Sequence, residues 1–362
     1  PSGAGTLSST HTHYIDLLAS TSLPAGIPPS GKQCSTPCAD SLARAVADAL
    51  TQDAADVDAA LLKQYQSIVG ALLYCATQTR PDVAFAVGML CRCMGKPTPA
   101  MLLQTSRVLC YLYRTRHLGL RFQPDQSDVS GMSDSDWAVK HSTSGYVFKL
   151  NSAAISWGSK KQASVALSSC EAEIMAASLA AQEAVYLSGF LNELGMRDES
   201  TPVELGVDNT GARDLAYNPE HHAKANHIER RHLFVREMVE NMRLRVPYVN
   251  PHDNLAGVVT KALPPHRLPA PRADLFLAHA ARLQEIDHLP HLAHAERRVR
   301  RSPPLRVLVL EPLPRLALHL QRVHARDADG LQVLVHAHLR LLGGEAIDAL
   351  HALAAGAQAR LR

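Results

Sequence analysis

The chain has 362 residues, of which 46% are hydrophobic, so it is long enough for two or three domains with apolar cores. Its 37 basic and 34 acidic residues give a net charge of only +3, so charge alone does not indicate a nucleic-acid-binding protein. Its seven cysteines form no even framework, which favours free or buried thiols in a reducing compartment over a disulfide scaffold.

The N-terminal sequence carries no signal peptide, and we expect no apolar run long enough to span a bilayer. The chain begins with Pro1 and not with methionine. From these features we expect a soluble intracellular piece of a longer protein.

Residues 11–120 are predicted to be mainly helical, because their apolar residues recur at helical spacing. The longest such pattern runs without interruption from residue 39 to residue 76. Two further helices are expected in RPDVAFAVGMLCRCM and PAMLLQTSRVLCYLYRT, each opened by a proline, which the first turn of a helix tolerates. This part of the chain offers no evident cluster of catalytic residues.

Residues 127–268 have a different pattern, typical of an α/β fold. Three short runs, GMSDSDWA, SGYVFKLN and AAISWGSKK, predict strands separated by turns. A capping box of Ser168 and Glu171 predicts the start of a long helix, which is expected to end at Gly195. The strands VELGVD and LRVPYV then alternate with helices in NTGARDLAY, HIERRHLFVREMVENM and HDNLAGVVTKAL, so we expect a mixed sheet with helices packed on it.

The composition changes abruptly at Pro264. From there to the end the chain has no Lys, Tyr, Trp, Cys, Met, Asn or Thr, whereas Arg, His, Leu, Ala and Pro dominate. Such a skew is typical of low-complexity sequence or of translation outside the natural reading frame. We assign this tail no function.

Three carboxylates lie in segments that suit a metal-dependent nuclease. Asp134 is at the expected end of a strand, Glu173 is one turn into the long helix, and Asp208 ends the next apolar strand. Hydrolysis of phosphodiesters with divalent ions needs acidic oxygens brought together on rigid elements, and little other side-chain chemistry. The ordered set therefore predicts a site that holds two metal ions.

Two neighbouring acidic residues are alternatives to members of this set. Asp136 lies two residues after Asp134 and therefore on the same face of the strand. Glu171 lies in the first turn of the helix, where a negative charge stabilises the helix dipole. A structural role for Glu171 is therefore the alternative to a role in the site.

The motifs in residues 11–268 occur in a distinctive order. YQSIVGALLYCATQTRPDVAFAVGML resembles the end of the reverse transcriptase region in copia-type LTR retrotransposon Pol polyproteins. SDSDWA, STSGYVFKL, ISWGSKKQASVALSSCEAEIMAAS, VDNTGA, NHIERRHLFVRE and LAGVVTKALP resemble the ribonuclease H domain that follows it. The paired aspartates of the polymerase site are absent, so no DNA synthesis is expected.

The resemblance implies a ribonuclease H-like fold, with a mixed five-stranded sheet and flanking helices. It divides the chain into residues 1–126, a helical thumb/connection-like end of the reverse transcriptase, and residues 127–268, the ribonuclease H-like domain. Residues 269–362 remain as an atypical tail rich in Arg, His, Leu and Ala.

The function implied is that of an endoribonuclease, which uses two Mg²⁺ ions, or Mn²⁺ in their place, to hydrolyse the RNA strand of RNA–DNA hybrids during reverse transcription. By family position, Asp134 matches the aspartate that bridges both ions, and Glu173 and Asp208 match the other two ligands. The implied partners are the hybrid and other parts of the polyprotein, with no membrane. The implied locations are cytoplasmic virus-like particles and the nucleus.

The fourth acidic position departs from the family pattern. Where the family reads Leu-Ala-Asp, this chain has Leu255, Ala256 and Gly257, so the second ion loses a ligand. Asp253 is the candidate substitute if the last helix already extends to it, and the alternative is that Asp253 caps that helix. A second hypothesis follows, in which the chain is a catalytically decayed retroelement remnant that at most binds nucleic acid.

Four residues are predicted to contact the hybrid. Lys160 and Lys161, after ISWGS, are candidates for its backbone, with a solvated turn as the alternative. Arg231 is expected on an amphipathic helix, where it faces either phosphate or solvent, and Asn209 follows Asp208 in the VDNTGA motif.

The two tryptophans, Trp137 and Trp157, fall in predicted strands. We predict that both anchor the core and do not stack on bases.

Overall fold

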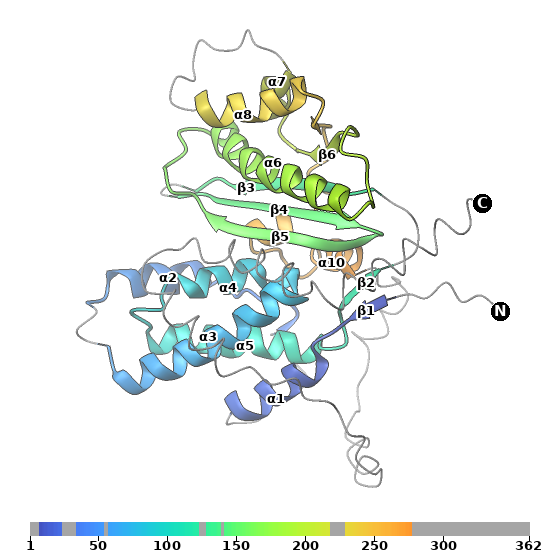
Figure 1. Cartoon of the computed structure of the whole chain (residues 1–362). Helices are drawn as coiled ribbons and strands as arrows, with labels where there is room; N and C mark the ends of the chain where they lie inside the picture. Colours follow the sequence, from blue (N-terminus) through green and yellow to red (C-terminus); the bar gives the residue numbers. More distant parts are fainter. Residues whose placement is uncertain are drawn as a thin grey trace, which may run out of the picture.

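The computed structural model describes residues 7–23, 34–53, 57–122, 128–138, 141–217 and 229–276. Within these residues a group of helices lies against one face of a five-stranded sheet, and further helices cover the other face (Figure 1). This is the α/β architecture with a mixed five-stranded sheet that the sequence predicted.

The N-terminal helices follow the predicted pattern, with one interruption. They are α1 (Thr12–Ser22), α2 (Leu42–Thr51), α3 (Ala59–Gln78), the 3₁₀ turn η3 (Pro81–Val83), α4 (Ala84–Cys91) and α5 (Pro99–Arg114). The expected continuous pattern over residues 39–76 is two helices, because the Asp58 side chain accepts the Leu61 N–H and starts a new helix there. A short antiparallel pair, β1 (Leu7–Ser9) and β2 (Leu120–Phe122), was not predicted.

The sheet has the strand order β5-β4-β3-β6-β7. Its strands are β3 (Ser130–Asp136), β4 (Thr143–Leu150), β5 (Ala153–Lys161), β6 (Val203–Gly206) and β7 (Leu244–Arg245). The first three form antiparallel pairs, whereas β6 is parallel to both β3 and β7. The hairpin between β4 and β5 turns on Asn151 and Ser152, both with positive φ, as a tight two-residue loop requires.

Five helices accompany or follow the sheet: α6 (Ser169–Glu193), α7 (Thr210–Tyr217), α8 (Glu229–Glu240), α9 (Gly257–Thr260) and α10 (Pro269–Phe276). As predicted, α6 begins at a cap, since the Ser168 hydroxyl accepts the Glu171 N–H at 3.1 Å. It ends before Gly195, whose φ of +67° allows the Met196 N–H to reach back to the Leu191 carbonyl.

α6 is also long and apolar enough to cross a membrane, judged by length and composition alone. This corrects the expectation that no run in the chain is long enough. Its place in the fold explains its composition, because 67% of the apolar stretch is buried against the sheet and the neighbouring helices, as in the core helix of a globular fold.

A single core joins the N-terminal helices to the sheet. Trp157 on β5 is 5% exposed, and its indole N–H donates to the Ala76 carbonyl of α3 at 2.8 Å. Trp157 is therefore the predicted core anchor. The same prediction for Trp137 is wrong, because Trp137 follows the end of β3 and is 56% exposed, with its indole N–H near the Ala166 carbonyl.

The same core includes α10, which lies within the atypical tail. Leu275 and Phe276 are fully buried, and α10 contacts β5, β2 and η3. The first residues of the tail are therefore part of the fold, and residues 277–362 lie outside the described part of the chain.

A buried ion pair links these elements. The Arg80 guanidinium donates to both Asp82 oxygens, at 2.9 and 2.8 Å, and neither side chain is exposed. Tyr111 donates to Asp82 at 2.7 Å, and Arg80 also donates to the Thr115 carbonyl at 3.1 Å. The Phe276 ring lies 5.7 Å from the guanidinium carbon. Residues of α5, α10 and the turn after α3 thus meet at one charge pair.

We expect Asp82→Asn to destabilise the chain strongly, because it leaves the buried Arg80 charge uncompensated. A loss of about 3–5 kcal/mol in the free energy of unfolding is typical for such a change. Urea unfolding of the variant measures it. Asp48→Asn removes an exposed partner of Arg44 and should cost less than about 1 kcal/mol. Equal unfolding midpoints for the two variants would contradict the assigned role of the pair.

Candidate metal centre

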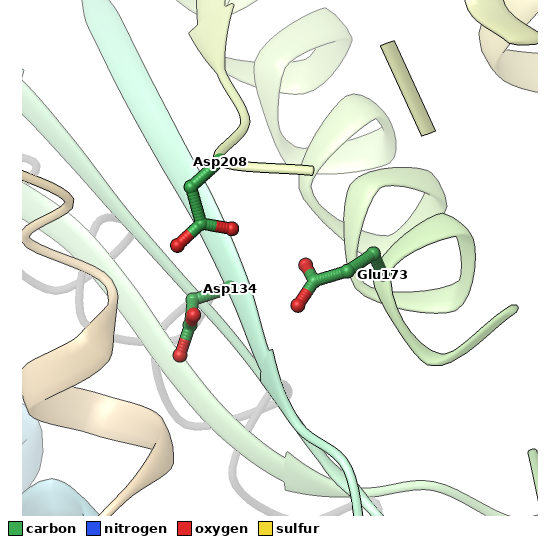
Figure 2. Close-up of side chains that lie close together, drawn as sticks. All are labelled: Asp134, Glu173 and Asp208. Atoms are coloured by element: carbon green, nitrogen blue, oxygen red, sulfur yellow. The ribbon is translucent and has the colours of Figure 1, made fainter. Parts of the chain in front are cut away.

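The three predicted carboxylates converge. Asp134 points from β3, Asp208 follows β6, and Glu173 projects from the first turns of α6 toward them (Figure 2). One ligand oxygen from each lies within 4.8 Å of the others. Asp134 is 1% exposed and Glu173 is 8% exposed, whereas Asp208 is half-buried.

The sheet register explains why two aspartates from distant segments meet. In the parallel pair of β3 and β6, Ser130 lies opposite Glu204 and Met132 lies opposite Gly206. Two residues further on, the same register brings Asp208 beside Asp134, and the alternation of side chains keeps both on one face. Since α6 packs across β3 on that face, its Glu173 completes the group.

The structure distinguishes the acidic alternatives. Asp136 is half-buried at the end of β3 and lies outside the cluster that the described residues form. Glu171 accepts the Leu167 N–H at 2.6 Å, so it completes the cap of α6, which is the structural role proposed as its alternative. Asp134 and Glu173 are therefore the members of the group.

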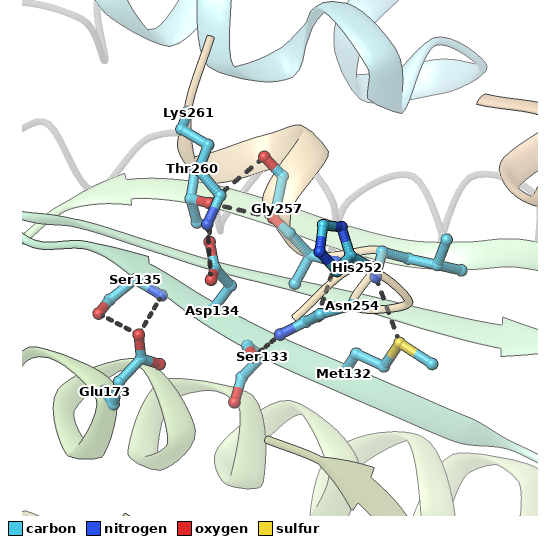
Figure 3. Close-up of polar contacts among 12 residues, drawn as sticks. Met132, Ser133, Asp134, Ser135, Glu173, His252, Asn254, Gly257, Thr260 and Lys261 are labelled. Atoms are coloured by element: carbon cyan, nitrogen blue, oxygen red, sulfur yellow. Dashed lines mark hydrogen bonds and ion pairs between the residues drawn. The ribbon is translucent and has the colours of Figure 1, made fainter. Parts of the chain in front are cut away.

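Glu173 is held by one of its two oxygens. Its Oε1 accepts both the backbone N–H and the hydroxyl of Ser135, at 3.2 and 2.8 Å (Figure 3). Its Oε2 is buried and has no hydrogen-bond partner among the described residues. Burial, and then the charges of Asp134 and Asp208, raise the pKa of Glu173 to about 8, although the Ser135 hydrogen bonds oppose this.

Asp134 is held on both oxygens from the segment around α9. Lys261 donates to Oδ1 at 3.1 Å, and the Thr260 hydroxyl donates to Oδ2 (Figure 3). Burial raises the pKa of Asp134, while Lys261 and Thr260 act in the opposite direction. Sequence reasoning missed these two residues, although both lie in the LAGVVTKALP motif.

The donor set suits a hard divalent cation. All three groups are carboxylates, whose oxygens Mg²⁺ and Mn²⁺ prefer, and no thiol or imidazole belongs to the cluster among the described residues. The unpartnered Oε2 of Glu173 is a buried acceptor directed at the group, and such an atom is costly unless a cation or donor satisfies it. The cluster could therefore hold a metal ion.

The fourth position is not filled by Asp253. The segment before α9 is a turn and not a helix, with the Asp253 N–H donating to the Asn250 carbonyl, and Asp253 is exposed and outside the cluster. The residue before α9 is Ala256, so Asp253 does not cap this helix either. The side chain of Asn254 holds this turn to β3, because it donates to the Ser133 carbonyl at 2.8 Å.

The predicted substrate contacts have mixed positions. Lys160 and Lys161 end strand β5 and do not lie in a turn, and Lys161 is exposed. The side-chain Oδ1 of Asn209 accepts the Ala212 N–H at 3.0 Å and so caps α7, which is a structural role. Arg231 lies in α8, but its side chain is outside the described part of the structure.

The chain is similar to proteins of transposons. The chain is 38% identical over 205 residues to the retrovirus-related Pol polyprotein from transposon RE1 of Arabidopsis thaliana, and 37% identical over 204 residues to that from transposon TNT 1-94 of Nicotiana tabacum. The chain belongs to the copia-type Pol polyproteins of retrotransposons. Each match covers 55% of this chain but only 14% or 15% of the length of the polyprotein.

A shorter relative carries a different name. This copia-type chain is 49% identical over 129 residues to secreted RxLR effector protein 161 of Plasmopara viticola, which covers 34% of this chain and 91% of that protein. No family model matches the chain.

We expect the stability of the metal-free chain to fall as pH rises. Between pH 4.5 and about 8 the folded chain keeps a proton on Glu173 that the unfolded chain releases, so ionisation favours unfolding. Glu173→Gln should remove the part of this decline that Glu173 causes and be more stable above pH 8 by on the order of 5 kcal/mol. Urea unfolding in EDTA across this pH range measures both effects.

Glu193→Gln is the matched control, because Glu193 is exposed on the same helix. It should follow the wild-type curve. A Glu173→Gln variant with the same pH dependence as the wild type would show that Glu173 does not carry this effect.

Proposed function

We propose that this chain is a ribonuclease H of a retrotransposon, which hydrolyses the RNA strand of RNA–DNA hybrids with Mg²⁺ during reverse transcription. The observation that carries the proposal is the convergence of Asp134, Glu173 and Asp208 within 4.8 Å over the inner strands β3 and β6 of a mixed sheet. Membership of the Pol polyproteins supports it, since reverse transcription needs an activity that removes RNA from hybrids.

In this proposal Asp134, Glu173 and Asp208 hold the divalent ions. When bound, such ions polarise the scissile phosphate and stabilise the departing oxygen. The remaining contacts fix the ligands in place. Ser135 holds one oxygen of Glu173, and Thr260 holds one oxygen of Asp134, so that the carboxylates are oriented before substrate binds.

Recognition of the hybrid is proposed to use its shape and backbone and not its base sequence. Contacts to 2′-hydroxyls and phosphates across the wide minor groove distinguish RNA without reading bases. Lys160 and Lys161, at the end of β5, are the proposed phosphate contacts, and Arg231 on α8 is a further one.

We assign residues 1–126 to the end of the reverse transcriptase and residues 127–268 to the ribonuclease H-like domain. Other parts of the polyprotein are the proposed protein partners, in cytoplasmic particles and in the nucleus. The two segments share one core, in which Trp157 is hydrogen-bonded to the Ala76 carbonyl, and this supports their joint folding.

We expect the purified chain to cut the RNA strand of a labelled RNA–DNA hybrid in Mg²⁺ and not in EDTA. Asp208→Asn should reduce the rate by on the order of 10²–10³, because it removes a charged ligand while keeping the size of the side chain. Asp208 suits this test because it is half-buried, so its substitution threatens the fold less than one at Asp134. Gel analysis of the cleaved RNA measures the rate.

Glu204→Gln is the matched control, since Glu204 lies on β6 with its side chain exposed beside Arg245. Its rate should equal that of the wild type. Cleavage that survives Asp208→Asn would point to a contaminating nuclease. A folded wild-type chain that leaves the hybrid intact would refute the proposed activity.

Gly257 favours the second candidate, a decayed remnant that at most binds nucleic acid. It has no side chain to offer at the fourth acidic position, and Asp253 does not replace it. In that case a folded chain retains the hybrid in a filter-binding assay but does not cut it. Cleavage of the hybrid by the same folded sample therefore distinguishes the ribonuclease from the remnant.

A further inference from the structure

A side-chain cation already lies at the metal site. The Lys261 ammonium is 3.1 Å from Oδ1 of Asp134, whose side chain is 2% exposed, while the Lys261 side chain is 39% exposed. Lys261 reaches the cluster from the α9 side, opposite α6 and Glu173 (Figure 3). One face of Asp134 is therefore occupied by positive charge.

The glycine at the fourth position lies beside this lysine. A Cβ atom added at Gly257 would stand 3.1 Å from Cε and 3.8 Å from Nζ of Lys261. An acidic side chain at this position would therefore meet the ammonium first. The position at which the resemblance implies a metal-binding carboxylate is, in this chain, adjacent to a positive charge.

The opposite side of the cluster remains open to an ion. There Oε2 of Glu173 is buried without a partner among the described residues, and Asp208 points into the same space (Figure 2). Oxygens of Asp134 that accept a hydrogen bond retain lone pairs, so Asp134 can still bind an ion on this side. Three carboxylates are balanced in charge by one divalent ion and one ammonium.

We propose that the Lys261 ammonium takes the place of the second divalent ion, so that the site binds one metal ion and not two. This inference rests on the proposed function, because it specifies the metal content of the same site.

The inference predicts what happens when a carboxylate is restored at position 257. A new carboxylate in Gly257→Asp would form an ion pair with Lys261 and would not recruit a second ion. A second ion requires that the carboxylate be added and the ammonium be removed together. Four chains therefore test the inference: the wild type, Gly257→Asp, Lys261→Met and the double variant.

We would count bound Mn²⁺ from the loss of the EPR signal of free Mn²⁺ during titration, since Mn²⁺ prefers the same oxygen ligands as Mg²⁺. We expect one ion in the wild type and in both single variants, and two in the double variant. Lys261→Met should bind its ion about tenfold more tightly, because a like charge near the ion is removed. Lys63→Met, which removes an exposed charge on α3, should match the wild type.

Two ions in the wild type, or in Gly257→Asp alone, would overturn the inference and leave the proposed function intact. One ion in the double variant, with circular dichroism showing a native fold, would also overturn it. A folded wild type that binds no Mn²⁺ would overturn the inference together with the metal site of the proposed function. The wild-type count needs no variant, so the test survives a substitution that prevents folding.

Discussion

Three carboxylates whose ligand oxygens lie within 4.8 Å repel one another, and two of them are buried away from the water that would screen them. The parallel pairing of β3 and β6, with α6 packed across them, imposes this proximity. The surroundings offset the repulsion unevenly. Asp134 receives hydrogen bonds from Thr260 and Lys261 on its two oxygens, whereas among the described residues Glu173 receives them only from Ser135, on one oxygen. The repulsion that remains uncompensated lies on the side of Glu173, and a cation bound there would reduce it.

The rigidity that this arrangement needs comes from outside the sheet as much as from within it. The core of the N-terminal helices continues into β4, β5, α9 and α10, so the segment that carries Thr260 and Lys261 is fixed between the sheet and η3. The buried ion pair of Arg80 and Asp82 lies in the same region, and its Arg80 guanidinium packs against the ring of Phe276 in α10. The N-terminal helical part of this Pol polyprotein therefore still positions residues of the site, because α9 packs against η3 and α4.

Features set by neighbouring residues were predictable from the sequence, and features set by distant contacts were not. The cap at Ser168, the end of α6 at Gly195 and the strand positions of the carboxylates follow from local hydrogen bonds and from periodicity. The contact of Lys261 with Asp134 joins residues 127 positions apart, and no local pattern announces it. The prediction that Asp253 replaces the fourth ligand was wrong for the same reason. The helix that would have carried Asp253 begins only at Gly257, after a turn that a hydrogen bond holds to β3.

The energetics of the site also bear on whether it has decayed. Glu173 reduces the stability of the metal-free fold near neutral pH, because burial and two neighbouring carboxylates oppose its ionisation. An amide at this position would keep the hydrogen bond from Ser135 and remove the repulsion, so a chain with no ion to hold would be more stable with glutamine there. The chain instead keeps three carboxyl groups together and leaves Oε2 of Glu173 unpaired among the described residues. A bound cation would make such an arrangement favourable. Under the one-ion proposal, the glycine at position 257 belongs to a site with altered metal content and not to a site without metal.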